Sequence, residues 1–268
     1  MVVIAPVVPH KPGTWRVIYF DAPNRGEQIR ILLALANTPF DDVRVSPFPQ
    51  GLDPYKKAAL GDDSPLLGTD MCPAVTAPDG THCVETTDIM RFVGQRVGMA
   101  PEADSAEDKR AMEACVLANT LMNTVFYGLL KAMIVERIFA TEFGGALWRL
   151  RGAAGGKPTP EPAQRLQEAL PKIEAAITGP YVLGAKMSYA DVSLFAILRE
   201  IFEFSVFDRA ALLAPCPKLT ALLDDLEGKA AGWIEERIEK HQLGIRSTVD
   251  YFAQTNTPVP WSRKRKPA

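Results

Sequence analysis

The chain has 268 residues, of which 47% are hydrophobic, and its formal net charge is -2 at pH 7. A chain of this length and composition can bury one large core or two smaller ones. The nearly balanced charge argues against nucleic acid as the main partner. We therefore expect a folded globular protein that does not bind nucleic acid.

The first residues of the chain, its apolar runs, and its cysteines and histidines exclude further classes of protein. The first nine residues are apolar, but they lack a basic start and are interrupted by prolines, so we expect no secretory signal. No apolar run approaches the length of about 20 residues that a membrane span needs. The cysteines (Cys72, Cys83, Cys115, Cys216) and histidines (His10, His82, His241) do not have metal-ligand or disulfide spacing. A cytoplasmic protein without a metal site or a membrane anchor is expected.

Short strand-like runs alternate with helical periods in the first hundred residues. Asp79-Gly80 is typical of a hairpin turn between two such runs. We expect strands at 15–20 and 41–46, a hairpin at 74–77 and 81–84, and helices at 25–36 and 86–97. This order predicts a small α/β unit of the thioredoxin type.

The segment from Cys72 to Thr86 has features of a peptide-binding site. A residue before proline is extended, and if the Cys72-Pro73 bond is cis, its backbone can stay free to pair with an extended peptide. Glu85-Thr86 starts a helix, whose first N–H groups and dipole favour a carboxylate, while Glu85 can pair with an ammonium group. A short peptide that carries both ends of an amino acid fits these features, and glutathione is such a ligand.

From residue 105 onward the pattern is helical almost throughout. We expect one long helix or a kinked pair at 105–140, a loop at 152–160, and helices at 161–178, 189–204, 217–227 and 230–242. The predicted organisation is an extension (1–14), a thioredoxin-like domain (15–98), an all-helical domain (105–243) and a tail (244–268). The basic run at 262–266 is interpreted as a solvated terminus rather than as an address or an anion-binding tail.

The helix expected at 189–204 has a capping box at its start. Ser188 can cap the Asp191 N–H, while the Asp191 side chain reaches back to the Ser188 N–H. The run that follows, 192–198, is almost wholly apolar. We therefore assign Asp191 a role in stability and not in catalysis.

Four separated segments resemble the cytosolic glutathione transferases. They are Trp15–Phe20 with Arg25–Ala34, Cys72-Pro73 with Glu85-Thr86, the run from Gly184 to Val192, and Pro217–Leu219 with Gly232–Ile234. Each motif alone is weak, but their order and spacing over residues 15–243 resemble the tyrosine-type enzymes, and most of all the sigma class. Taken together, these motifs imply a thioredoxin-like domain joined to an all-helical domain.

The resemblance implies thiolate chemistry at Tyr19. A thiol with a pKa of about 8.5 is only about 3% ionised at pH 7, so the enzyme must stabilise the thiolate. The Tyr19 phenol would donate a hydrogen bond to the sulfur, and Arg25 would keep the local potential positive. The alternative is that Tyr19 is only a half-buried strand residue. No Ser or Cys lies between Tyr19 and Ile29, which favours the tyrosine assignment over the serine and cysteine types.

The other expected contacts each have an alternative. The implied glutathione-binding set is Tyr19, Lys57, Cys72, Pro73, Glu85 and Thr86. The alternative to a ligand role is a plain helix cap for Thr86, an ordinary first-turn acid for Glu85 and a solvated lysine for Lys57. Cys72 is interpreted as a small hydrophobe, with a mixed disulfide to glutathione as the alternative. The electrophile pocket would be lined by Met122, Tyr127 and Met133, which core packing explains equally well.

The implied assembly and reaction follow from the same resemblance. We expect a homodimer that joins glutathione, as co-substrate and without another cofactor, to a small hydrophobic electrophile. Residues 114–135 hold no Asp or Glu, so an acid contributed to the neighbouring subunit is not expected, and Asn119 and Asn123 are the polar candidates there. The alternatives are an isomerase or peroxidase that uses the same site, or a non-catalytic binding or structural protein.

Overall fold

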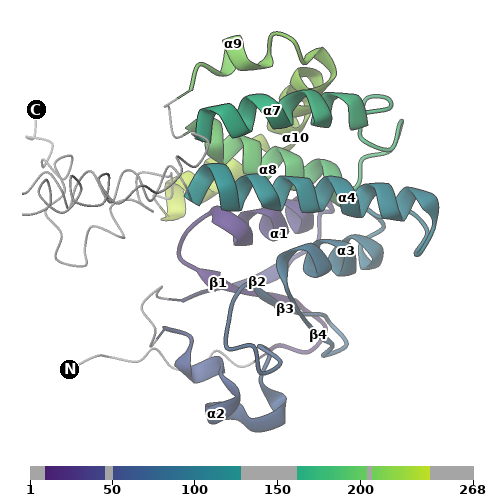
Figure 1. Ribbon diagram of the computed structural model, residues 1–268. Helices are drawn as coiled ribbons and strands as arrows, with labels where there is room; N and C mark the ends of the chain where they lie inside the picture. Colours follow the sequence, from purple (N-terminus) through teal and green to yellow (C-terminus); the bar gives the residue numbers. More distant parts are fainter. Residues whose placement is uncertain (1–9, 46–50, 128–161, 204–206, 242–268) are drawn as a thin grey trace, which may run out of the picture.

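The computed structural model describes residues 10–45, 51–127, 162–203 and 207–241 (Figure 1). Its first half contains a four-stranded sheet in the order β2-β1-β3-β4. β2 pairs parallel to β1, whereas β3 pairs antiparallel to both β1 and β4. The strands are β1 (Trp15–Phe20), β2 (Phe40–Val45), β3 (Ala74–Thr76) and β4 (His82–Val84), and the helices over the sheet are α1 (Asn24–Leu35) and α3 (Thr86–Arg96).

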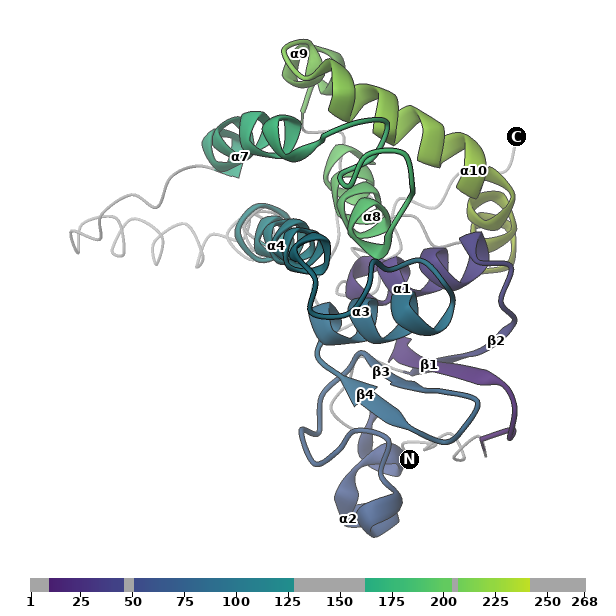
Figure 2. The same cartoon turned by 90° about the vertical axis from the view of Figure 1, so that its right-hand side faces the viewer.

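The two faces of the sheet are covered by different parts of the chain. α1 and α3 lie on one face, and the segment that holds the short helix α2 (Lys57–Leu60) lies beyond the other face (Figures 1 and 2). Two 3₁₀ turns flank α2, namely η2 (Asp53–Tyr55) and η3 (Gly61–Asp63). The expected strands, hairpin and helices of this half are confirmed to within about one residue at each end. α2 and its turns were not predicted.

The regular elements described in the second half are all helices. α4 (Ala106–Leu121) continues into the π-helical turn η4 (Met122–Phe126), and α7 (Pro162–Ala176), α8 (Tyr189–Glu203), α9 (Arg209–Leu213) and α10 (Pro217–His241) follow. The chain therefore has the predicted fold class, an α/β unit with a thioredoxin-like sheet followed by helices. The expected continuation of the long helix beyond Tyr127, the loop at 152–160 and the tail at 244–268 lie outside the described residues.

Two elements of the second half differ from the prediction, because the short helix α9 was not expected and α10 was expected as two helices. The two helices expected at 217–227 and 230–242 form the single helix α10. The gap between the two expected ranges contains Gly228, but apolar side chains continue past it at helical spacing. Their burial against the core holds the helix through the glycine. These side chains are Leu219, Leu222, Leu223, Leu226, Ala230 and Ile234.

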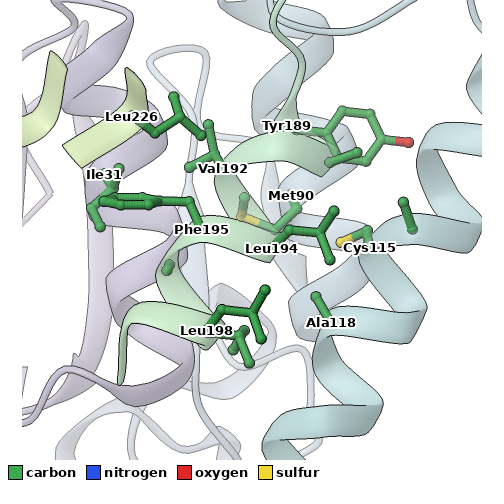
Figure 3. Close-up of a cluster of buried hydrophobic side chains, with 14 of the residues drawn as sticks. Ile31, Met90, Cys115, Ala118, Tyr189, Val192, Leu194, Phe195, Leu198 and Leu226 are labelled. Carbon is green, nitrogen blue, oxygen red and sulfur yellow. The ribbon is translucent and has the colours of Figure 1, made fainter. Parts of the chain in front are cut away.

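The main hydrophobic core passes from the sheet into the helical half. α8 is buried along almost its whole length and contacts α1, α3, α4 and α10. Figure 3 shows side chains of α8 surrounded by residues of these other helices. Leu194 and Phe195 of α8 are 1% exposed, and Ile31 of α1 and Met90 of α3 are equally buried. The two halves therefore share one continuous core.

Asp191 at the start of α8 accepts three hydrogen bonds. Its carboxylate binds the backbone N–H groups of Val182 at 2.7 Å and Ser188 at 2.8 Å, and the Ser188 hydroxyl at 2.9 Å. The predicted hydrogen bond from the Ser188 N–H to the Asp191 carboxylate is confirmed. The predicted cap by the Ser188 hydroxyl is wrong, because that hydroxyl donates to Asp191 and the Asp191 N–H is directed to the Ser188 carbonyl.

We expect Asp191→Ala to destabilise the fold strongly. The substitution leaves two buried N–H groups without an acceptor, which costs about 1 to 3 kcal/mol for each group. A shift of about 2 to 4 °C per kcal/mol predicts a melting temperature lower by roughly 5 °C or more. Differential scanning calorimetry measures the shift. Asp208→Ala is the matched control, since Asp208 caps α9 with a single exposed bond, and an equal shift in both variants contradicts the role of Asp191.

Candidate functional site

Tyr19 lies near the end of β1, and its side chain is 2% exposed. Its ring packs directly on the backbone of Gly26 in the first turn of α1, and the guanidinium carbon of Arg30 lies 5.8 Å from the ring centre. A Cβ atom on Gly26 would lie 2.4 Å from Cδ1 of Tyr19. The ring position therefore requires a glycine at residue 26.

The environment of Tyr19 keeps its phenol protonated. Burial raises the pKa of Tyr19 well above its ordinary value, and Tyr127, Cys72 and Glu200 raise it further. The Arg25 backbone N–H, which faces the phenolic oxygen, acts in the opposite direction and lowers the pKa. At neutral pH the hydroxyl keeps its proton, so it can donate a hydrogen bond to an anion.

Arg30 fixes the turn between β1 and α1. Its guanidinium is fully buried and donates to the carbonyl oxygens of Phe20 at 3.3 Å and Ala22 at 2.8 Å. It also donates to the Asp42 carboxylate of β2 at 2.9 Å. These bonds satisfy a buried charge and hold the turn beside Tyr19 in one conformation.

Arg25 points toward the second half of the chain. Its guanidinium donates to the side-chain oxygen of Asn123 in η4 and lies 5.9 Å from the ring centre of Tyr127. Arg25 and Tyr127 are half-buried, and Asn123 is exposed. The structure thus brings Arg25 and Tyr127, which the sequence placed in different subsites, close to each other next to Tyr19.

The Cys72-Pro73 peptide bond is cis, which meets the condition set above for a backbone that is free to pair with an extended peptide. It directly precedes β3, the strand that pairs with β1. Burial raises the pKa of the Cys72 thiol to about 12. This position fits a small hydrophobe and disfavours a reactive thiol.

The start of α3 carries the second predicted contact region. Glu85 is exposed and has a positive φ of 67°, and no side chain caps the helix that begins at Thr86. The Thr86 hydroxyl is buried and has no hydrogen-bond partner in the described structure. The alternative that Thr86 is a plain helix cap is therefore wrong. Free first-turn N–H groups and an unused hydroxyl form a suitable site for a carboxylate.

The remaining predicted residues lie in different surroundings. Lys57 is exposed and forms an ion pair with Asp62 at 2.9 Å. Met122 is fully buried in the main core, the position that core packing predicts, and Tyr127 packs at its edge. Met133 lies outside the described residues. The ligand roles of these residues stay predictions.

Asn119, one of the two polar candidates for a contact with a neighbouring subunit, is buried within this chain. Its amide exchanges hydrogen bonds with Gln28 of α1 at 3.1 and 3.3 Å. Ser193 of α8 also donates to Gln28. Asn119 therefore joins α1, α4 and α8 and is not available at the surface.

The sequence analysis missed four residues around Tyr19, namely Asn24, Gly26, Arg30 and Glu200. Arg30 and Gly26 belong to the helical motif that was recognised, but the motif gives no distance to Tyr19. Glu200 lies 176 residues after Asn24 in the chain, and its carboxylate accepts the Asn24 N–H at 2.5 Å. No local pattern in the sequence indicates such a contact.

The described residues contain neither a metal-binding cluster nor a helix that could span a membrane. No group of three or more His, Cys, Asp or Glu side chains is arranged to hold a metal ion within the described part of the chain. Among the described helices, none is long and apolar enough to cross a membrane.

Comparisons with known proteins agree with this architecture. Residues 157–237 match the family model described as glutathione S-transferase, C-terminal domain. No curated protein sequence matched the chain. The match covers α7, α8, α9 and most of α10 and supports a place in the glutathione S-transferase superfamily.

Solved structures show the same fold over most of the chain. The Pi-class glutathione S-transferase of Onchocerca volvulus has 18% identity and a TM-score of 0.60, covering 87% of this chain and 97% of that chain. The glutathione S-transferase of Ascaris lumbricoides has 18% identity and a TM-score of 0.58, covering 84% and 97%. A possible glutathione S-transferase of Rhodopseudomonas palustris has 14% identity and a TM-score of 0.55, covering 80% and 93%. The chain has the glutathione S-transferase fold.

We expect Gly26→Ala to displace the Tyr19 ring and destabilise the protein. The added methyl group would overlap three ring and Cβ atoms of Tyr19, and such overpacking costs about 1 to 3 kcal/mol. Gly228→Ala is the matched control, since a Cβ there meets no atom within 4 Å, and it should stabilise α10 by up to about 1 kcal/mol. Urea unfolding measures both changes, and a stabilised Gly26→Ala protein contradicts the packing of Tyr19 on residue 26.

We expect Cys72 to resist thiol reagents at neutral and mildly alkaline pH. With its pKa near about 12, only about 0.01% of the thiol is ionised at pH 8, whereas a free thiol of pKa about 8.5 is about 24% ionised. Labelling by a disulfide reagent, followed by peptide mass spectrometry, measures the rate against free glutathione. The rate should rise about tenfold per pH unit from pH 8 to 10, and fast labelling at pH 7 contradicts the buried environment.

Proposed function

We propose that the protein is a glutathione transferase of the tyrosine type, which joins the glutathione thiolate to small hydrophobic electrophiles. The observation that carries the proposal is the buried Tyr19 on β1, the strand that pairs with β3 directly after the cis Cys72-Pro73 bond. A phenol that keeps its proton stabilises a thiolate by hydrogen bonding, whereas a phenolate would repel it.

The opposite end of glutathione is proposed to bind at the start of α3. The buried Thr86 hydroxyl without a partner and the uncapped N–H groups would receive the γ-glutamyl carboxylate. The exposed Glu85 carboxylate would pair with the α-ammonium group. The backbone of Cys72, held by the cis bond, would pair with the extended peptide between the two ends.

The proposal includes the wider assignments that the resemblance implies. The electrophile would enter on the side of Arg25 and Tyr127, which are half-buried beside Tyr19. The active assembly is proposed to be a cytoplasmic homodimer with closest similarity to the sigma class.

Glu85→Ala should weaken glutathione binding by about 1.5 to 3 kcal/mol, the contribution of a hydrogen bond to a charged group. Isothermal titration calorimetry measures the affinity of the folded variant. Glu107→Ala is the matched control, because Glu107 is an exposed acid in the first turn of α4. Unchanged affinity in Glu85→Ala contradicts the proposed binding site.

Tyr19→Phe should change the ionisation of bound glutathione and leave the fold intact. If the site lowers the thiol pKa by about two units from about 8.5, the thiolate fraction at pH 7 rises from about 3% to about 76%, equivalent to about 2.7 kcal/mol. Removal of the hydroxyl should then slow conjugation of a chloronitrobenzene about tenfold or more at pH 7. Above about pH 9 most of the loss should disappear, because the thiol then ionises without help.

Stopped-flow absorbance near the thiolate band titrates bound glutathione in both proteins. Tyr181→Phe is the control, since its hydroxyl bonds Asp225 at 2.7 Å on the surface of the helical half. Identical thiol titrations in wild type and Tyr19→Phe would show that Tyr19 only packs the sheet.

A further inference from the structure

The turn between β1 and α1 is held from two sides by buried charged groups. Arg30 of α1 binds the carbonyl oxygens of Phe20 and Ala22 from one side. Glu200 of α8, which is 2% exposed, accepts the Asn24 N–H from the other side at 2.5 Å. α8 lies over α1 in both views of the molecule (Figures 1 and 2), so the second half of the chain reaches the turn directly.

Asn24 has a conformation that needs support from its surroundings. Its φ is 42°, in the left-handed region that non-glycine residues rarely adopt, although asparagine tolerates it better than most. The side chain of Asn24 is 6% exposed, and its oxygen has no hydrogen-bond partner in the described structure. The hydrogen bond from the Asn24 N–H to the Glu200 carboxylate is therefore the interaction that stabilises this conformation of Asn24.

The same bond limits the orientation of the next amide. Only the φ and ψ angles of Asn24 separate the Asn24 N–H from the Arg25 N–H, because the peptide units are planar. Once Glu200 orients the first N–H and Asn24 is held in the left-handed region, the direction of the second is set. Gly26, on whose backbone the Tyr19 ring packs, follows one residue later. The turn that Glu200 holds at Asn24 therefore leads directly into the backbone that supports the Tyr19 ring.

We propose that Glu200 is a positioning residue for Tyr19, which acts by holding the Asn24 turn and with it the backbone of Gly26, on which the Tyr19 ring packs. This inference rests on the proposed function, since it assigns Glu200 a part in thiolate stabilisation. Among the described residues, the charged and titratable groups around Tyr19 are Tyr127, Cys72, Arg25, Arg30 and Glu200 itself. Glu200 is the one among them that hydrogen-bonds the backbone of the turn from the helical half.

Three variants on α8 test the proposal. Glu200→Met keeps the side-chain volume and removes the acceptor, and Glu200→Gln keeps a neutral, weaker acceptor. Glu203→Met is the matched control, because Glu203 lies one turn further along α8 and pairs with Arg199 instead of the turn. The measurement is amide hydrogen exchange at Asn24 and Arg25 by nuclear magnetic resonance, in the full chain without glutathione.

The expected order of protection at Asn24 is wild type, then Glu200→Gln, then Glu200→Met. Exchange should be about tenfold or more faster in Glu200→Met, since the turn opens locally, and unchanged in Glu203→Met. If Glu200→Met does not fold, Glu200→Gln decides, with severalfold faster exchange expected at Asn24. The proposal is overturned if a folded Glu200→Met protein exchanges the Asn24 amide at the wild-type rate. If Glu200→Met does not fold, the same result in Glu200→Gln overturns it.

Kinetics then separate positioning from general stability. At a temperature where each variant is folded, Glu200→Met should lower kcat at pH 7 about tenfold with little change in KM for glutathione, because a misplaced donor affects the reacting thiolate. The bound thiol should titrate closer to its free value of about 8.5, and Glu200→Gln should restore most of the difference. A rise in KM with unchanged kcat and thiol titration overturns the proposal. Wild-type protein that binds no glutathione contradicts the proposed function, whereas the exchange experiment still measures the role of Glu200 in the turn.

Discussion

The buried guanidinium of Arg30 is the interaction on which the arrangement around Tyr19 depends. Its ion pair with Asp42 joins α1 to β2, and its bonds to Phe20 and Ala22 shape the turn that joins β1 to α1. A fully buried charge is costly unless its donors are satisfied, so its partners must lie in a defined geometry. The Tyr19 ring lies against this cation, and its position follows from the same geometry.

Local patterns were sufficient to predict the four strands of the sheet and the helices α1 and α3. Asp79-Gly80 marks a two-stranded hairpin and the cis bond precedes β3, because turn chemistry and proline restrict the backbone within a few residues. The short helices α2 and α9 were missed since four or five residues give too little periodicity. The division of α10 at Gly228 was wrong because burial on both sides of the glycine outweighs its propensity.

The candidate site was predictable only where its residues are close in sequence. Tyr19 at the end of a strand and Glu85-Thr86 at the start of a helix follow from local structure, and the structure shows Thr86 with an unused hydroxyl. The contact of Tyr19 with Gly26 depends on how α1 crosses the sheet, which periodicity does not give. The bond from Asn24 to Glu200 depends on how the two halves pack, and no local rule contains that information.

The candidate site depends on the helical core because the two halves of the chain pack directly against each other. Gln28 on α1, Asn119 on α4 and Ser193 on α8 form a buried polar network that is satisfied only when the three helices are in register. A shift of α8 would break this network and would also move Glu200 away from the turn beside Tyr19. Because the alternative registers leave buried polar groups unpaired, the network favours the one packing in which the turn is supported. The helical half therefore contributes to the geometry at Tyr19 in two ways. Its packing supports the turn beside Tyr19, and it forms the side of the candidate site on which Tyr127 lies.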